Sequence, residues 1–389
     1  MRILLLLIFT LPVTTLNAQT VTIPDANFLD VLVNGFVADL DGFGGPDGDV
    51  DTNGDGLIQV AEAEAVFGLW LDNYDISSVQ GIESFVNLDF LSLEGNNLTE
   101  LDLSSNTLLV ELECSSNELT TVNISQCPNL TLLNVNYNQL SQIDVSNNAN
   151  LIIFNVTFNN LTSIDVSQNL LLESLGCFYN QLSGLIVSNN TALKRLSCQF
   201  NQIQELDVSN NPELIRLLCF NNLISSLDVS SNSQLKELDG QNNQLNYLNI
   251  NNGNNTQFLR MYATSNPDLS CIQVDDVTYS NNQVCENLTP LWCKDDTAEY
   301  SENCGLSVSN FSKNRFKLYP NPVEDILFIE DTSSNNNVLS FAIYNQLGSV
   351  VYITNSFSTS LDLSNLTSGL YFCEIRTDKG KNIYKILKK

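Results

Sequence analysis

Oxygen-bearing side chains recur at alternate positions in one short stretch near the N-terminus. Gly56 lies within the stretch, and its backbone freedom permits a sharp turn there. Carboxylate, amide and main-chain oxygens are the ligands that Ca²⁺ prefers, and a final glutamate can bind the ion with both oxygens. The spacing therefore predicts a structural Ca²⁺ site whose ligands are Asp51, Asn53, Asp55, Leu57, Gln59 and Glu62.

This stretch resembles the calcium loop of EF-hand proteins at every fixed position. Leu57 would offer its carbonyl, and Glu62 would bind from the start of a helix expected over Val60–Phe67. The preceding residues, 42–50, are rich in Gly and Asp and do not predict an entering helix. The loop is therefore closer to the calcium loops of extracellular modules, with an affinity of about 10⁻⁴ to 10⁻³ M. The alternative is a solvated acidic turn.

Histidine is absent from the chain. Because histidine is the usual general base and the commonest zinc ligand, Ser-His-Asp and Cys-His catalysis are excluded. An enzyme would instead need a pair of carboxylates in a pocket, whereas the acidic residues are spread along the sequence. We therefore expect the protein not to be an enzyme.

Four of the ten cysteines fall close together in the sequence. An even set of this kind in an exported protein predicts two disulfides, and four cysteines allow three pairings. The nested pairing is favoured, with Cys271 bonded to Cys304 and Cys285 bonded to Cys293. A second group, Cys177, Cys198 and Cys219, recurs every 21 residues. It indicates either a metal or redox site or, more simply, buried and inert thiols.

Charge is distributed unevenly along the chain. Residues 19–312 carry 37 acidic side chains against 6 basic ones, a net charge of −31, whereas residues 313–389 carry 7 against 9. So acidic a body repels phosphate backbones, which makes nucleic acid an unfavourable partner. Carboxylates in this number suit divalent cations and solubility.

A repeat of 21 residues organises the middle of the chain. Leucines begin successive copies at positions 88, 109, 130, 151, 172, 193, 214 and 235, and asparagines follow at positions 96, 117, 138, 159, 180, 201, 222 and 243. The unit resembles the leucine-rich repeat, L-x-x-L-x-L/C-x-x-N-x-L. Alternating apolar residues predict a short strand in each copy, and the strands of neighbouring copies would pair in parallel. A second segment, such as Ile143–Ser146, predicts a strand or extended turn on the convex side.

The fold class expected from these patterns is mainly β. It comprises a leucine-rich-repeat solenoid of about nine to ten 21-residue repeats with parallel strands, followed by a small immunoglobulin-like β-sandwich. We divide the chain into a signal peptide (1–18), an N-terminal cap with helix and calcium loop (19–65), the solenoid (66–270), a cysteine-rich C-terminal cap (271–304), a linker (305–313) and a C-terminal domain (314–389). Spacing of apolar residues predicts a capping helix over Pro24–Phe36.

The signal peptide rests on one basic residue followed by a short apolar run and a small residue, Ala18, at the cleavage point. No later apolar run is long enough to span a bilayer, so the mature chain is expected to have no membrane span.

The C-terminal domain resembles the type A sorting domain of the bacterial type IX secretion system. Four sequence blocks carry the resemblance, and their characteristic residues are Tyr319, Pro320, Asn321, Pro322, Gly348, Gly369 and Tyr371. The resemblance implies that the secretion machinery recognises the tail, that the tail is removed, and that the protein is secreted or attached to the outer cell surface. The alternative is an ordinary accessory β-domain.

Two sets of side chains suggest a ligand surface on the concave face of the solenoid. The first is a row of aromatic residues near the conserved position of each repeat's Asn: Tyr137, Phe158, Tyr179 and Phe200, with Phe178 and Phe220 beside them. The second is a set of basic residues: Arg195, Arg216 and Arg260. Such residues can stack on sugars or anchor a protein, so a protein or glycan ligand is expected. Alternatively, the rings stabilise the solenoid and the arginines balance Glu237 and Asp239, as in a structural surface-layer protein.

Overall fold

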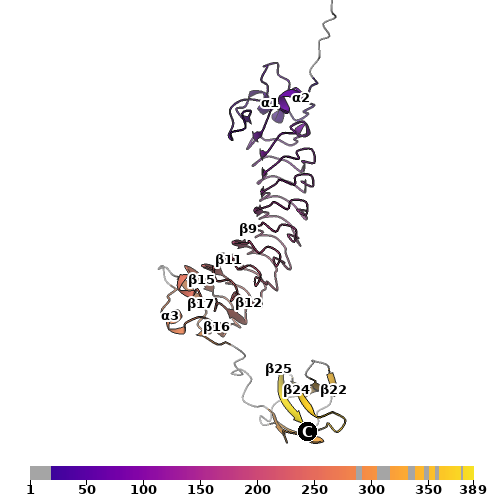
Figure 1. The fold of residues 1–389 in the computed structure, drawn as a ribbon, viewed down its shortest axis with the longest axis vertical. Helices are drawn as coiled ribbons and strands as arrows, with labels where there is room; N and C mark the ends of the chain where they lie inside the picture. The colour runs from indigo at the N-terminus through magenta and orange to yellow at the C-terminus, as the bar shows by residue number, and fades with distance from the viewer. Residues whose placement is uncertain are drawn as a thin grey trace, which may run out of the picture. The chain divides into compact units, whose positions relative to one another are not determined.

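The computed structural model describes residues 19–285, 291–304, 316–331, 338–345, 350–354, 359–377 and 380–389. The predicted signal peptide, the linker at 305–313 and Gly348 lie outside the described residues. The chain divides into two compact units, Met1–Cys304 and Gly305–Lys389 (Figure 1). Each unit is described by itself below.

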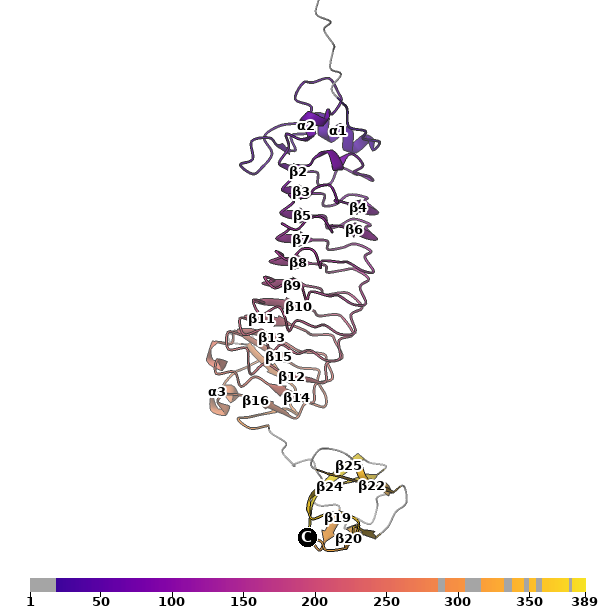
Figure 2. The ribbon, with the colours of Figure 1, turned by 45° about the vertical axis from the view of Figure 1, so that its right-hand side comes forward.

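A long sheet runs the length of the first unit (Figure 2). Its twelve strands are β1 (Ala38–Asp39), β2 (Gly68–Trp70), β3 (Phe90–Ser92), β5 (Glu111–Glu113), β7 (Leu132–Asn134), β8 (Ile153–Asn155), β9 (Ser174–Gly176), β10 (Arg195–Ser197), β11 (Arg216–Leu218), β13 (Glu237–Asp239), β15 (Arg260–Ala263) and β17 (Leu291–Lys294). Apart from the antiparallel β1–β2 pair, neighbours pair in parallel and in register, as Leu196 does with Leu217. The predicted parallel solenoid is confirmed.

The opposite side of the solenoid carries two short parallel sheets. One pairs β4 (Glu100–Asp102) with β6 (Thr121–Asn123), and the other has the order β12 (Ser226–Asp228), β14 (Tyr247–Asn249), β16 (Cys271–Gln273) and β18 (Glu299–Ser301). Between them, segments such as Ile143–Ser146 contain no assigned strand. The expectation of strand or extended turn therefore describes different repeats.

The core of this unit is built from the apolar columns of the repeat. Leu112, Leu133 and Phe154, at the centres of successive strands, have no exposed surface, and the buried residues form one continuous cluster. A single turn cannot cover its own inward side chains, so each turn is stabilised by its two neighbours.

Asparagine side chains connect the turns in two ladders. The first is the predicted column, in which the amide of Asn159 donates to the carbonyls of Val135 (2.9 Å) and Val156 (3.3 Å) and its oxygen accepts the Leu140 N–H (2.9 Å). The second ladder, which we did not predict, lies fully buried on the opposite side at Asn106, Asn148, Asn169, Asn190, Asn211 and Asn232. Both ladders pair carbonyls that the turns would otherwise leave buried and unbonded.

Replacing Asn159 by Ala is expected to destabilise the solenoid by about 3 kcal/mol, because a buried N–H and two carbonyls would lose partners. The neighbouring Asn160 is exposed, so Asn160→Ala is a matched control with an expected effect below about 0.5 kcal/mol. Urea unfolding of residues 19–304 measures both. Equal effects of the two substitutions would contradict the role assigned to the ladder.

The N-terminal end is closed by helix α1 (Ala26–Asn34), as predicted. Asp25 caps it by accepting the N–H groups of Asn27 and Phe28, and the same carboxylate accepts those of Ser77 and Ser78 from the first repeat. Helix α2 is shorter than expected and covers Val60–Ala63 rather than Val60–Phe67. The helix ends early because the Phe67 N–H donates to the Asp39 carbonyl and leads directly into β2.

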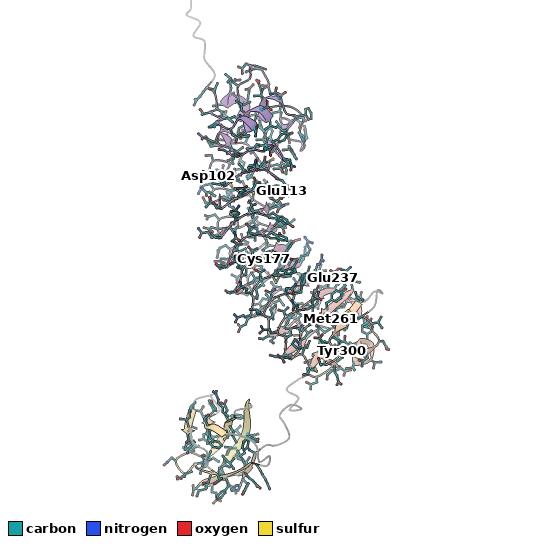
Figure 3. The ribbon with its side chains drawn as sticks, turned by 180° about the vertical axis from the view of Figure 1, so that it is seen from behind. Asp102, Glu113, Cys177, Glu237, Met261 and Tyr300 are labelled. Carbon is teal, nitrogen blue, oxygen red and sulfur yellow. A yellow bond between two sulfur atoms is a disulfide. The ribbon has the colours of Figure 1, made fainter. Side chains whose placement is uncertain are left out.

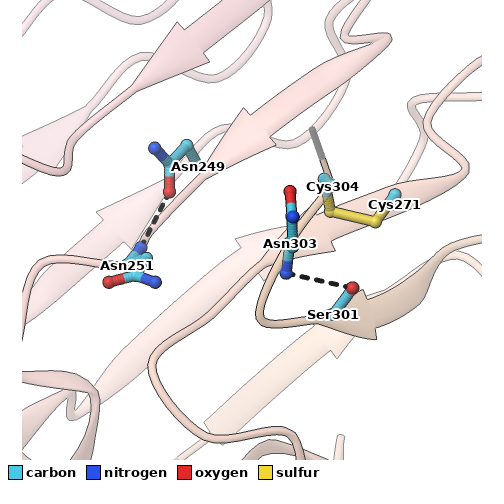
Figure 4. The surroundings of a disulfide bond; sticks show 6 residues. All are labelled: Asn249, Asn251, Cys271, Ser301, Asn303 and Cys304. Carbon is cyan, nitrogen blue, oxygen red and sulfur yellow. Dashed lines mark hydrogen bonds between the residues drawn. A yellow bond between two sulfur atoms is a disulfide. The ribbon is translucent and has the colours of Figure 1, made fainter. Parts of the chain in front are cut away.

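The C-terminal end continues both sheets through β16, β17 and β18, so the cysteine-rich segment contributes further turns of the solenoid. It also contains helix α3 (Val277–Asn281), while the short 3₁₀ helices η1 (Ile82–Ser84) and η2 (Asn255–Gln257) lie earlier in the chain. Cys271 is bonded to Cys304 and Cys285 to Cys293, which is the nested pairing (Figure 4).

The second unit is a sandwich of two antiparallel sheets. The first sheet is β19 (Phe316–Tyr319), β20 (Ile326–Asp331) and β23 (Ser360–Asp362), and the second is β22 (Val350–Thr354), β21 (Val338–Tyr344), β24 (Gly369–Thr377) and β25 (Gly380–Lys388). Leu327 and Leu361 of one sheet and Phe341 and Ile375 of the other share a core. The strand β19 was not predicted.

Candidate binding surface and calcium loop

The outward side of the long sheet, here called the long-sheet face, corresponds to the predicted concave surface. Because the strands are in register, equivalent residues of successive repeats form columns across this face. The first column begins at the N-terminal side with Phe90 and Glu111 and includes all three predicted arginines. Glu113 and Glu237 lie along this side of the solenoid, whereas Asp102 lies on the other (Figure 3).

The three arginines are the first residues of β10, β11 and β15, and their side chains are exposed. Arg216 forms an ion pair with Glu237 on the next strand, with 3.0 Å between Nε and Oε2. Arg195 donates to the Ser174 hydroxyl at 3.3 Å. Charge balancing therefore accounts for Arg216, while no carboxylate among the described residues pairs with Arg195.

The predicted aromatic residues form a continuous stack at the edge of this face. Ring centroids are 4.2 Å apart for Tyr137 and Phe158, 4.3 Å for Phe158 and Tyr179, and 4.0 Å for Tyr179 and Phe200. Phe178 and Phe220 contact the stack edge-on. The ring faces inside the stack are therefore covered by other rings, and a ligand can reach the ring edges and the outer faces.

The backbone at the stack is unusual for aromatic residues. Tyr137, Phe158, Tyr179 and Phe200 have φ angles of 51 to 55°, in the left-handed region. The equivalent positions in other repeats are Gly95, Ser116, Asn221 and Asn242, also with positive φ. Glycine and asparagine adopt this conformation readily, whereas bulky residues pay roughly 1–2 kcal/mol each. The four aromatic residues therefore occupy positions where local backbone preference favours smaller residues.

The predicted calcium ligands belong to one hydrogen-bonded loop. The buried carboxylate of Asp51 accepts the N–H groups of Gly54 (2.9 Å) and Gly56 (2.7 Å). Glu62 accepts the Thr52 hydroxyl (2.9 Å) and the Gln59 N–H (3.0 Å). Local Asx-type bonds of this kind shape the loop without any ion.

The centre of the loop is occupied by the Gln59 side-chain amide. Its nitrogen donates to both carboxylate oxygens of Asp55 and to the Leu57 carbonyl, each at 3.2 Å, and its oxygen accepts the Asn53 amide. An N–H₂ group thus contacts three oxygens that were predicted to bind a cation. The donor set is chemically that of Ca²⁺, once this amide turns its oxygen inward.

A different trio of acids is packed more closely. Asp39, Asp41 and Asp47 place one oxygen each within 4.8 Å of one another, and no comparable group occurs elsewhere in the described part of the chain. Asp39 accepts the N–H groups of Gly42 (2.6 Å) and Gly44 (2.9 Å), so it holds the glycine-rich loop in place. The sequence analysis noted this loop only as unable to form a helix.

The cysteine column is buried. Cys177, Cys198 and Cys219 have no exposed surface, and burial raises the pKa of the Cys177 thiol to about 12. A protonated, inaccessible thiol is a poor nucleophile and a poor metal ligand. The geometry favours inert core residues over a redox or metal site.

At pH 8 the native solenoid, residues 19–304, is expected to give no rapid reaction with a thiol-specific reagent, although it contains five free cysteines. Denaturation should release all five. Ile186 is 77% exposed, so an Ile186→Cys variant provides a positive control that should react at once. Fast labelling of Cys177 in the native wild type would contradict the assignment.

Comparison with known families concerns the C-terminal unit first. Residues 317–389 match the family described as the secretion system C-terminal sorting domain. The chain ends in a secretion sorting domain. Within it, Asn321 of the predicted motif bonds to the Lys385 carbonyl (2.8 Å) and the Leu387 N–H (2.9 Å), and the Tyr371 hydroxyl donates to the Thr367 carbonyl. The motif residues therefore fasten the ends of the sandwich.

The solved structures resemble the chain in fold. The functional domain of InlJ from Listeria monocytogenes, described as including a cysteine ladder, is 23% identical over 95% of this chain and 98% of that chain, with a TM-score of 0.52. The internalin InlF from Listeria monocytogenes is 21% identical over 72% of this chain and 96% of that chain, with a TM-score of 0.45. A leucine-rich-repeat protein of Leptospira interrogans is 19% identical over 51% and 58%, with a TM-score of 0.39. No curated protein matched the chain.

No helix in the described residues is long and apolar enough to cross a membrane.

Proposed function

We propose that this protein is an exported leucine-rich-repeat binding protein, active in the medium or on the outer cell surface, which recognises a protein or glycan on its long-sheet face without catalysis. The observation that carries the proposal is the aromatic stack. Four large rings are kept at backbone positions that favour asparagine or glycine. Backbone strain of this kind persists where function requires it.

Export is supported by the sorting domain at residues 317–389. The nested disulfides are consistent with an oxidising compartment, where such bonds persist. The long-sheet face adds exposed arginines beside the aromatic edges, and aromatic and arginine side chains are the residues most enriched at binding hot spots.

A structural surface-layer role is the second candidate. The close stacking of Tyr137, Phe158, Tyr179 and Phe200 favours it, because stacked rings also stabilise neighbouring turns. In that case the protein would have no specific ligand.

A glycan and protein array probed with residues 19–304 separates the two candidates. A binding protein should give a small set of saturable hits that persist at 150 mM salt. An array without specific hits would favour the surface-layer role and overturn the binding proposal.

The second part of the proposal is that the loop from Asp51 to Glu62 binds a structural Ca²⁺ ion. Its support is the gathering of Asp51, Asn53, Asp55 and Gln59 oxygens around a site now filled by an amide. Such an ion would join the N-terminal cap to the first repeat through α2.

At 10 mM Ca²⁺ and a dissociation constant of about 10⁻⁴ to 10⁻³ M, the cap should gain roughly 1.4–2.7 kcal/mol of stability. Calorimetry should show Ca²⁺ binding, and chelation should lower the melting temperature of residues 19–304. Glu62→Gln should remove both effects, whereas Glu64→Gln, at an exposed position two residues later, should keep them. If chelation leaves the melting temperature unchanged and no binding heat is measured, the calcium site is wrong.

A further inference from the structure

We infer that the long-sheet face binds an extended peptide segment of a partner protein, with basic side chains over β3 and β5 and an acidic side chain over β10. The inference rests on the proposed function, because it places the ligand on the same face, and it adds the chemical class of that ligand. It is carried by the opposite charges at two ends of one uncharged strip.

The N-terminal end of the strip is acidic. Glu111 and Glu113 project from β5, and Glu94 and Asp72 lie on the preceding turns. Burial raises the pKa of Glu113, and the neighbouring carboxylates of Glu94, Glu111 and Asp72 raise it further, although Asn134 donates to it at 2.6 Å. Residues 19–193 contain no lysine or arginine that could neutralise this charge. A cationic side chain supplied by a partner would relieve the repulsion.

Aromatic rings adjoin these carboxylates. Trp70 of β2 and Phe90 of β3 stack with centroids 4.5 Å apart, and both are half-buried on the long-sheet face. Carboxylates beside an aromatic surface suit a guanidinium group, which binds carboxylates in pairs and stacks on rings. Arginine is therefore the basic residue that this end fits best.

The other end of the strip is basic. The exposed side chain of Arg195 on β10 contacts only the Ser174 hydroxyl among the polar partners described above. The adjacent Arg216 is held by Glu237, so it adds positive potential without being available itself. A carboxylate from a partner can pair with Arg195 in a bidentate geometry.

The strip between the two ends carries no charge. Its outward residues on β7, β8 and β9 are Leu132, Asn134, Ile153, Asn155 and Ser174. Four strand spacings separate β5 from β10, about 19 Å at roughly 4.8 Å per spacing. An extended peptide covers this distance in about six residues. The face therefore selects a basic and an acidic side chain about six positions apart, and it disfavours polyanions, polycations and neutral glycans.

Selection from a library of random 12-residue peptides on residues 19–304 at 50 mM salt tests the inference. The enriched peptides should share a basic and an acidic residue five to seven positions apart. Binding should weaken about three- to ten-fold for Glu111→Gln with Glu113→Gln, and similarly for Arg195→Gln. The charge-matched controls Glu118→Gln and Lys236→Gln alter exposed residues outside the strip and should leave affinity unchanged.

A charge reversal makes the test directional. On Arg195→Glu, the library should lose the acidic residue and gain a second basic residue at the same spacing. Enriched peptides without separated charges, or no enriched peptide, would overturn the inference. Specific glycan hits on the array with no enriched peptide would overturn it while leaving the proposed binding function intact.

Discussion

Deletion of residues 314–389 is expected to abolish appearance of the protein outside the cell while leaving the solenoid folded. The deleted segment contains the whole sorting-domain match. The two units have separate hydrophobic cores, so the deletion exposes no core residue of the solenoid. Immunoblots of envelope fractions and medium, in a bacterium with type IX secretion, should show the truncated chain held in the envelope.

A reciprocal fusion is the control for this deletion. A reporter protein placed between residues 1–18 and residues 305–389 should leave the cell, because the tail acts as the address. Surface display of the truncated chain at the wild-type level would contradict the sorting assignment.

Replacing Tyr137, Phe158, Tyr179 and Phe200 together by Asn is expected to weaken ligand binding about a hundred-fold, because buried aromatic contacts dominate binding energies. The fold should survive. Three stacked pairs would be lost, at about 0.5–1.5 kcal/mol each, but four strained residues would gain a side chain that accepts the left-handed backbone. The same position is already Asn221 and Asn242 in later repeats.

Titration of the best array ligand into this variant measures the loss, and circular dichroism with thermal unfolding checks the fold. Leu170→Asn with Leu171→Asn is the matched control, since these side chains are more than half exposed and lie away from the stack. A ladder variant that binds as tightly as the wild type would remove the aromatic residues from the site.

The repeat made the solenoid predictable, because inward positions such as Leu112 and Leu133 must be apolar in every turn. The nested disulfides also followed from spacing. Local pattern was less informative where backbone conformation departs from preference. Nothing in the side-chain types of Tyr137 or Phe158 indicates a left-handed backbone, which only the asparagines and glycine of the other repeats reveal.

Other features carried a signal that sequence analysis did not use. The second asparagine ladder recurs as serine followed two residues later by asparagine, as in Ser167 and Asn169. Its structural role depends on carbonyls of the preceding turn, Val145 and Asn148, which cannot be identified without the stacking register. Likewise, the helix after the calcium loop ends at Ala63 because of a tertiary bond from Phe67, and no local residue signals that stop.

Hydroxyl-radical footprinting of residues 19–304, with and without the array ligand, tests most directly whether the protein binds through its long-sheet face. Ligand should protect Tyr137 and Tyr179, which are 54% and 41% exposed in the free protein. It should leave Ile186 and Leu170, which are 77% and 56% exposed and lie elsewhere on the solenoid, unchanged. Protection of Ile186 and Leu170 with no change at the two tyrosines would contradict a binding site on the long-sheet face.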